Sequence, residues 1–110
     1  MASGTYIIRD NVGLSTYTHD NMPNINGTIS IVKYGRIVYV SGEFTTLIQI
    51  PAFTTIIDTP SPVSVVDVLA FDGNGNIVAP LYINTSNKLA SRKVIPANTL
   101  LYFSTMYIEA

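Results

Sequence analysis

The chain contains no cysteine and few charged residues. The absence of cysteine excludes disulfides, thiolate nucleophiles and thiolate metal sites. Only 12% of its 110 residues are charged, whereas 47% are hydrophobic, and average proteins carry about 25% charge. Because large exposed apolar patches are rare on monomers, this shortage predicts that part of the surface faces other subunits. The alternative is a monomer coated with Thr, Ser, Asn and Tyr.

Further absences narrow the function classes. Six Lys and Arg and seven Asp and Glu are scattered singly and give a net charge of −1, so nucleic acid has no basic run to bind. No apolar run approaches the roughly 20 residues of a membrane helix, so membrane insertion is not expected. The first residues also lack the basic and apolar segments of a signal peptide. A length of 110 residues favours one domain with its own core.

Short apolar runs alternate with turns that contain Gly or Asn. These two residue types accept the positive φ of tight turns, while β-branched and aromatic residues suit strands. The expected elements are the hairpin Gly27–Gly42, the strand Glu43–Ile50, the run Val63–Phe71, the turn Asp72–Asn76, the run Ile77–Ile83, the turn Asn84–Lys88 and the run Leu100–Ile108. No window shows helical periodicity. The pattern predicts an all-β chain, an antiparallel, jelly-roll-like β-sandwich of about eight to nine strands.

The N-terminal part is less regular than the rest. It is expected to hold a short strand, a turn and a polar surface connection, at Thr5–Ile8, Asp10–Gly13 and Ser15–Asn26. Two prolines make Ala52–Pro62 an expected extended connection. The hairpin Gly27–Gly42 has apolar residues on both faces, so both faces are expected to be covered. We therefore divide the single domain into residues 1–26 and a sandwich head, residues 27–110.

Three stretches together carry a family resemblance. They are Gly27–Val38 (GTISIVKYGRIV), Ala79–Leu89 (APLYINTSNKL) and Asn98–Ile108 (NTLLYFSTMYI). The series resembles the C-terminal head domains of bacteriophage tail-fibre and baseplate receptor-binding proteins. Many such domains also have a Leu-Pro-Ala-Gly-Tyr-x-Pro segment, which Ile50–Phe53 begins but the following residues do not continue.

The resemblance implies a function as well as a fold. It implies a jelly-roll-like homotrimer around a three-fold axis, at the tip of a phage tail beside other virion tail proteins. Such a head attaches to host cell-surface saccharide, here without cleaving it. The alternatives are a virion structural, decoration or fibre-assembly protein that binds no ligand, and a fragment of a polysaccharide depolymerase. The scarcity of acidic residues disfavours the depolymerase.

Saccharide sites combine aromatic faces with polar groups, so the candidates are side chains on or beside turns. The candidate ligand-binding residues are His19, Asp20, Tyr34, Arg36, Tyr39, Asn74, Asn84 and Asn87. Tyr82 is a further candidate aromatic, because it lies just before the turn Asn84–Lys88. Three phenylalanines of the expected strands, Phe44, Phe71 and Phe103, are expected in the core instead.

Neither catalysis nor a metal or cofactor site is predicted. His19 and Asp20 form the only neighbouring His–carboxylate pair, and a triad would also need a positioned Ser. The turn Asp72–Asn76 resembles the start of a calcium loop, but that loop requires Gly at its sixth position and Glu at its twelfth. Isoleucine occupies both positions. Paired carboxylates for glycoside hydrolysis are not evident among Glu43, Asp58, Asp67 and Asp72.

Asp67 lies inside an apolar strand pattern. Because an unpaired buried charge is costly, Asp67 is expected to be buried and paired with Lys33, Arg92 or Lys93 of the same or another subunit. This structural role is preferred to a catalytic one.

Overall fold

A computed structural model of the chain describes residues 8–11, 14–20 and 24–110, and the side chains of residues 24–110. These residues form strands and turns, and no helix occurs among them. The strands are β1 (Ile8–Asn11), β2 (Leu14–Asp20), β3 (Ile25–Tyr34), β4 (Ile37–Thr46), β5 (Thr55–Asp58), β6 (Val66–Phe71), β7 (Ile77–Ile83), β8 (Lys88–Ser91) and β9 (Leu100–Ile108). All of their pairings are antiparallel. The prediction of an all-β, antiparallel chain is confirmed for this part of the sequence.

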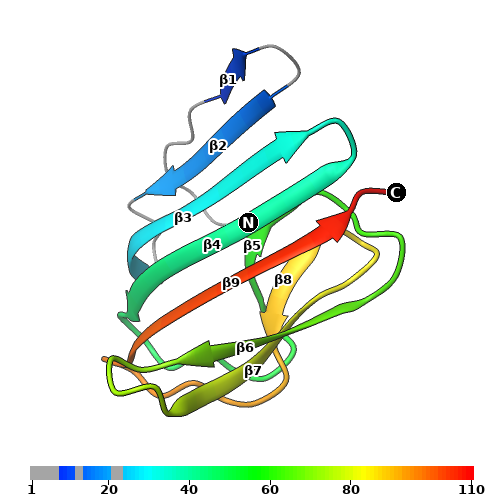
Figure 1. Cartoon of the computed structure of the whole chain (residues 1–110). Coiled ribbons are helices and arrows are strands. Elements are labelled where there is room, and N and C mark those ends of the chain that lie inside the picture. The colour runs from blue at the N-terminus through cyan, green and yellow to red at the C-terminus, as the bar shows by residue number, and fades with distance from the viewer. Residues whose placement is uncertain (1–7, 12–13, 21–23) are drawn as a thin grey trace.

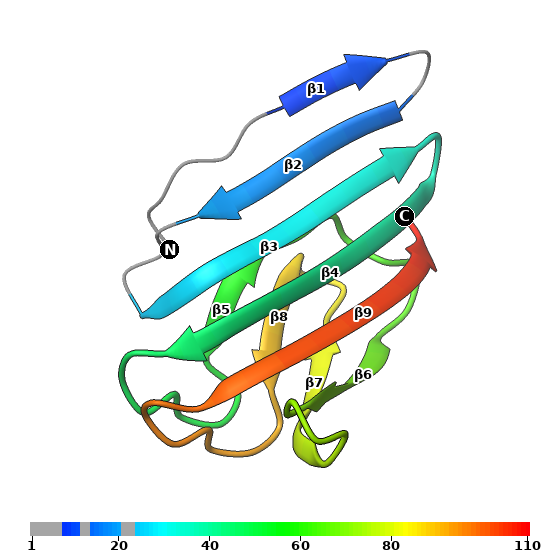
Figure 2. The same cartoon turned by 60° about the vertical axis from the view of Figure 1, so that its left-hand side comes forward.

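The strands join in the order β1-β2-β3-β4-β9-β6-β7-β8-β5. The sheet curls on itself, so that β5, β6, β7 and β8 lie across from β3, β4 and β9 (Figures 1 and 2). The join between the two halves is narrow, because β6 and β9 pair only at Phe71 and Tyr102. A bridge between Pro62 and Glu109 holds the other end of this join.

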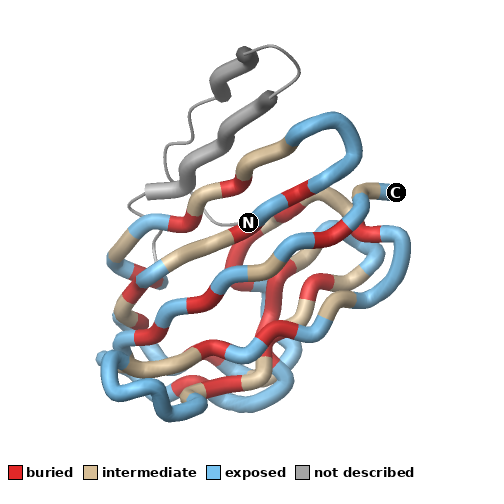
Figure 3. Tube along the Cα trace, in the orientation of Figure 1, coloured by how far each residue is buried: buried red, intermediate tan, exposed pale blue. Residues whose placement is uncertain are grey.

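The core lies between the two halves of the curled sheet, and along β4, β6, β7 and β9 the buried positions mostly alternate with more exposed ones (Figure 3). One half contributes Ile29, Ile31, Val38, Val40, Phe44, Leu101 and Phe103, and the other contributes Ile57, Val68, Ala70, Leu81, Ile83 and Leu89. The rings of Phe44 and Phe103 meet edge to face with centroids 6.4 Å apart. Their predicted burial is confirmed, whereas Phe71 is only half-buried.

Two glycines of the β3–β4 ribbon make room for this core. A Cβ atom on Gly42 would lie 2.9 Å from Ile29 Cγ1 and 3.1 Å from the Phe103 ring. A Cβ atom on Gly27 would lie 2.3 Å from the backbone oxygen of Glu43, and Gly27 also has a φ of 151°. Gly27 therefore sits inside β3 because the neighbouring backbone approaches closely there.

Two connections expected from the sequence contain strands instead. Leu14–Asp20 forms β2 inside the expected connection Ser15–Asn26, and β5 lies inside Ala52–Pro62. The backbone of β2 is held by its antiparallel ladder to β3 (Figure 2). A ladder of backbone hydrogen bonds does not require an apolar period in the sequence, so periodicity did not reveal this strand.

Other boundaries shift by a few residues. Asp10 and Asn11, expected in a turn, end β1. The strand expected over Glu43–Ile50 ends at Thr46 and is continuous with the second strand of the hairpin. The rest of the expected first strand, Thr5–Ile7, lies outside the described residues.

Ionisation of Tyr107 is expected to lower the stability of the fold at alkaline pH. Its hydroxyl donates to the Pro60 carbonyl at 2.7 Å, and burial raises the pKa of Tyr107 to about 12. An unfolded tyrosine loses its proton near pH 10, so between about pH 10 and 12 the unfolded state binds fewer protons than the folded state. The free energy of unfolding should therefore fall in this window, with a limiting slope of about 1.4 kcal/mol per pH unit for one proton.

Chemical denaturation from pH 8 to 12 tests this expectation. The Tyr107→Phe variant should be less stable at pH 8, because the Pro60 carbonyl loses its donor. The difference between the two proteins should then shrink above pH 10. A difference that stays constant up to pH 12 would contradict the assignment.

Candidate functional site

The outer face of β3, β4 and β9 has an exposed apolar surface at the end nearest the β3–β4 turn. Two rows cross the three strands in register, Tyr34–Ile37–Ile108 and Val32–Tyr39–Met106. Residues in register share one face of a sheet, and this face points away from the core. We call these six side chains the apolar patch. Val32 is half-buried and the other five are exposed, with Met106 at 67%.

The same face becomes polar farther from that turn. The next row is Ser30, Ser41 and Ser104, and the row after it is Thr28, Glu43, Tyr102 and Phe71. The rings of Tyr102 and Phe71 lie 6.0 Å apart and are tilted by 34°. The outer face therefore combines an apolar end, a serine row and an end where aromatic rings lie beside an exposed carboxylate.

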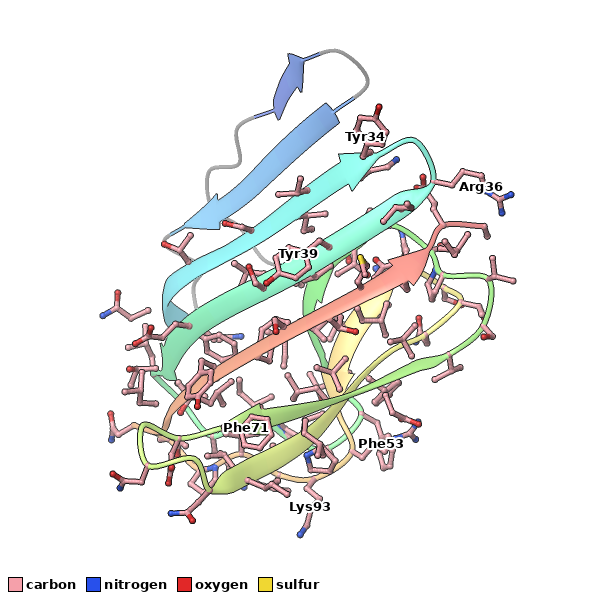
Figure 4. The ribbon with its side chains drawn as sticks, viewed as in Figure 1. Tyr34, Arg36, Tyr39, Phe53, Phe71 and Lys93 are labelled. Carbon is pink, nitrogen blue, oxygen red and sulfur yellow. The ribbon has the colours of Figure 1, made fainter. Side chains whose placement is uncertain are left out.

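Tyr34 and Tyr39, two of the predicted site residues, belong to the apolar patch. Figure 4 shows Tyr39 on the outer side of β4 and Arg36 extending from the turn. Arg36 does not point into the patch as a free cation, because its Nε and Nη2 donate to the Glu109 carbonyl at 2.9 and 2.8 Å. The Glu109 N–H donates back to the Arg36 carbonyl at 2.7 Å. Arg36 thus fastens the segment after β9 to the β3–β4 turn.

The predicted asparagines lie in two different turns. Asn84 Oδ1 accepts from the backbone N–H groups of Ser86 and Lys88 at 2.9 and 3.1 Å. Asn87 has a φ of 60°, a conformation that asparagine tolerates. Its carbonyl accepts from Thr59 N–H at 2.9 Å. Both asparagines thus shape the turn between β7 and β8.

Asn74 lies at the other end of the molecule from the β3–β4 turn, in the β6–β7 turn (Figure 1). Asp72 Oδ1 accepts from the backbone N–H groups of Asn76 and Asn74 at 3.0 and 2.8 Å. These hydrogen bonds lower the pKa of Asp72. The hairpin interpretation of Asp72–Asn76 is confirmed.

The predicted residues therefore do not gather at one place. His19 and Asp20 lie in β2, in register with Ile29 and Thr28, and their side chains are outside the described part. Of the eight candidates, the structure brings together Tyr34 and Tyr39, with Arg36 at the edge of the same surface.

A second cluster lies on the outer face of the other half of the sheet. Asp67 of β6 and Tyr82 of β7 are in register, and Arg92 follows β8. Arg92 Cζ lies 4.5 Å from the centre of the Tyr82 ring, and Arg92 Nη2 donates to Asp67 Oδ1 at 2.8 Å. Phe53, from the loop after β4, places its ring 6.3 Å from that of Tyr82. We call these four residues the aromatic–arginine cluster.

Sequence reasoning found this cluster only in part. The pairing of Asp67 with Arg92 was one of the predicted alternatives and is confirmed, but the predicted burial is wrong, because the Asp67 side chain is 74% exposed. The apolar neighbours Val66 and Val68 face the core side instead, since successive side chains of a strand alternate. Phe53 gave no signal beyond its place after Pro51-Ala52.

Most described carboxylates have a structural partner. Asp58 contacts Lys88 at 2.6 Å, and Glu109 contacts Lys33 at 2.7 Å. Asp67 is paired with Arg92, and Asp72 accepts hydrogen bonds from the backbone of its own turn. Among the side chains of residues 24–110, no group of three or more Asp or Glu residues could hold a metal ion. This part of the chain also contains no helix able to cross a membrane.

Comparison of the chain with known protein families gives no match, and a search of curated proteins gives none either. The resemblance to phage receptor-binding heads thus stays a prediction based on the three quoted stretches.

Proposed function

We propose that the chain is the receptor-binding head of a phage tail-fibre or baseplate protein. It assembles as a homotrimer at the tail tip, beside other tail proteins, and holds host cell-surface saccharide without cleaving it. In this proposal the curled sheet is a jelly-roll-like sandwich, with β3, β4 and β9 in one layer and β5 to β8 in the other.

The observation that carries the proposal is the apolar patch. Its six side chains bear no charge, and five of them are exposed in a single copy of the chain. Soluble monomers rarely keep such patches uncovered, and only 12% of all residues are charged. A second and third copy that bury the patch would explain both facts. The expectation that the hairpin is covered on both faces is then met by the core on one side and by other subunits on the other.

The described carboxylates support binding without cleavage. Glycoside hydrolysis requires two carboxyl groups that flank the scissile bond, one of them free to act as an acid. Asp58, Asp67 and Glu109 are each paired with a cation, and Asp72 is held by its own turn. Glu43 stands alone among serine and aromatic side chains on the outer face, which suits hydrogen bonding to a hydroxyl.

Three measurements on the purified protein test this proposal. Light scattering at micromolar concentration should give three times the 12.0-kDa chain mass, and a glycan array should show binding to bacterial surface saccharides. Incubation with host cell wall should leave the polymer length unchanged. A trimer that binds nothing on the array would favour the virion structural protein, and shortened polymer would favour the depolymerase. A 12.0-kDa monomer would contradict the assembly.

A further inference from the structure

The strongest unexplained feature of the surface is the conformation of Phe53. Its φ of 62° lies in the left-handed region, and its side chain is 66% exposed. Left-handed backbone costs a non-glycine residue about 1–3 kcal/mol. Among the described residues, the other non-glycine positions with positive φ are Asn87 and Asn98, and asparagine adopts this conformation readily. An exposed phenylalanine recovers little of the cost by burial, so its retention points to a contact outside the chain.

The loop that carries Phe53 is held firmly in place. Phe53 N–H donates to the carbonyl of Ser91, the last residue of β8, at 2.7 Å. On the other side, Ile50 and Ile95 exchange backbone hydrogen bonds at 2.8 and 2.9 Å. The ring also contacts Tyr82, with a tilt of 55° between the two planes. The exposed ring is therefore a fixed platform, which lowers the entropy cost of binding a ligand to it.

A fixed pair of polar groups lies beside this platform. Arg92 Nε and Nη2 both donate to Asp67 Oδ1, at 3.1 and 2.8 Å, while the guanidinium stacks on Tyr82. Asp67 Oδ2 and Arg92 Nη1 make no hydrogen bond to another described residue. One acceptor and one donor of opposite charge are thus held next to each other at an exposed surface.

We propose that the aromatic–arginine cluster binds a single neutral pyranose unit of the saccharide. The apolar C–H face of the sugar ring lies on Phe53. One of two adjacent hydroxyls donates to Asp67 Oδ2, and the other accepts from Arg92 Nη1. The assignment rests on the proposed saccharide binding and names where that binding occurs.

The chemistry of the cluster selects this ligand class. A vicinal diol offers a donor and an acceptor at neighbouring positions and so matches the Asp67–Arg92 pair. A phosphate or carboxylate would meet the exposed charge of Asp67, which opposes anion binding by Arg92. A purely apolar ligand would leave both charged groups desolvated without partners. Neutral sugars are the class that uses the ring and both polar groups.

The position of the cluster is compatible with assembly through the apolar patch. The patch lies on the outer face of β3, β4 and β9, while Asp67 and Tyr82 lie on the outer face of β6 and β7, across the core. In Figure 4, Phe53 and Lys93 lie at the opposite end of the view from Tyr34 and Arg36. Each subunit of a trimer would thus present its own sugar site, and three weak sites would act together on a cell surface.

The test uses the full chain and a panel of methyl pyranosides. The panel contains the glucoside, galactoside, mannoside, rhamnoside and N-acetylglucosaminide. Binding is measured by saturation-transfer NMR and by titration. Phe53→Gly should weaken binding by about tenfold or more, equivalent to about 1.4 kcal/mol. Its melting temperature should stay the same or rise, because glycine relieves the left-handed backbone. Phe53→Tyr should retain binding. The matched control is Asn98→Gly, also at a φ of 60°, which should leave binding unchanged.

A second variant tests the polar pair independently of the ring. Asp67→Asn keeps the shape of the side chain but removes the carboxylate, and it should also weaken binding by about tenfold. Loss of binding in both variants with trimer mass intact supports the site. If the unmodified protein binds a sugar and both variants bind it equally well, the site is overturned and the proposed function survives. If the unmodified protein binds no saccharide on the panel or the array, both are overturned.

Discussion

Replacing Met106 with lysine is expected to convert the proposed trimer into 12.0-kDa monomers. Met106 is the most exposed member of the apolar patch and is in register with Tyr39 and Val32. If three copies bury this patch, the substitution places three ammonium groups in an apolar interface. Breaking a buried arrangement with an unpaired charge costs about 3–5 kcal/mol, which is enough to dissociate a complex that is stable at micromolar concentration. Light scattering and sedimentation measure the mass.

Ile48→Lys is the matched control, since Ile48 is 50% exposed but lies in the loop after β4, outside the patch. It should leave the trimer intact. Under the proposed function, the Met106→Lys monomer should bind a single methyl pyranoside as well as the trimer does but adhere to host cells about a hundredfold less tightly, because avidity is lost. Trimers that persist in the Met106→Lys variant would show that subunits meet through another surface.

Gly27→Ala is expected to lower the free energy of unfolding by about 3 kcal/mol, or roughly 12 °C or more in melting temperature. Two independent penalties act at this position. The φ of 151° disfavours any side chain, and the new Cβ would lie 2.3 Å from the Glu43 carbonyl oxygen and 2.7 Å from Phe44 Cα. Relief requires β3 and β4 to separate, which would disturb the packing of Phe44 in the core. Thermal and urea denaturation measure the loss.

Gly73→Ala provides the control for this substitution. Gly73 lies in the β6–β7 turn, and a Cβ atom there would meet nothing within 4 Å. Its effect should stay within about 0.5 kcal/mol of zero. Equal effects of the two substitutions would contradict the close approach of β4 to Gly27.

The candidate residues show how far local patterns reach. The turns at Asp72–Asn76 and Asn84–Lys88 were predictable because their side chains bond to their own backbone a few residues away. Asn84 is explained by these hydrogen bonds, and Asn87 by its left-handed backbone, with a φ of 60°. The signal that identifies a turn is therefore a poor signal for a ligand site, because the geometry of the turn already explains why the residue is there.

Arg36 shows the opposite limitation. Its exposure in a tight turn made it a candidate, but its guanidinium is bound to the carbonyl of Glu109, 73 positions away. A hydrogen bond across that separation leaves no mark on either local sequence. The experiment on the patch therefore changes Met106 and leaves Arg36 in place, since removing Arg36 would loosen the segment after β9.

The sequence by itself determined the turns of residues 27–110 and most of their strands, with β5 as an exception. Those features depend on alternation and on residues a few positions apart, so short segments carry them. Only the tertiary structure decided which apolar face stays uncovered, because the hairpin Gly27–Gly42 is apolar on both sides and only the position of β5 to β8 distinguishes them. It also decided the β2 strand, whose polar residues are held by a ladder to β3, and it brought Phe53, Tyr82 and Arg92 together. Contacts between such distant positions depend on how the sheet curls, which no local pattern encodes.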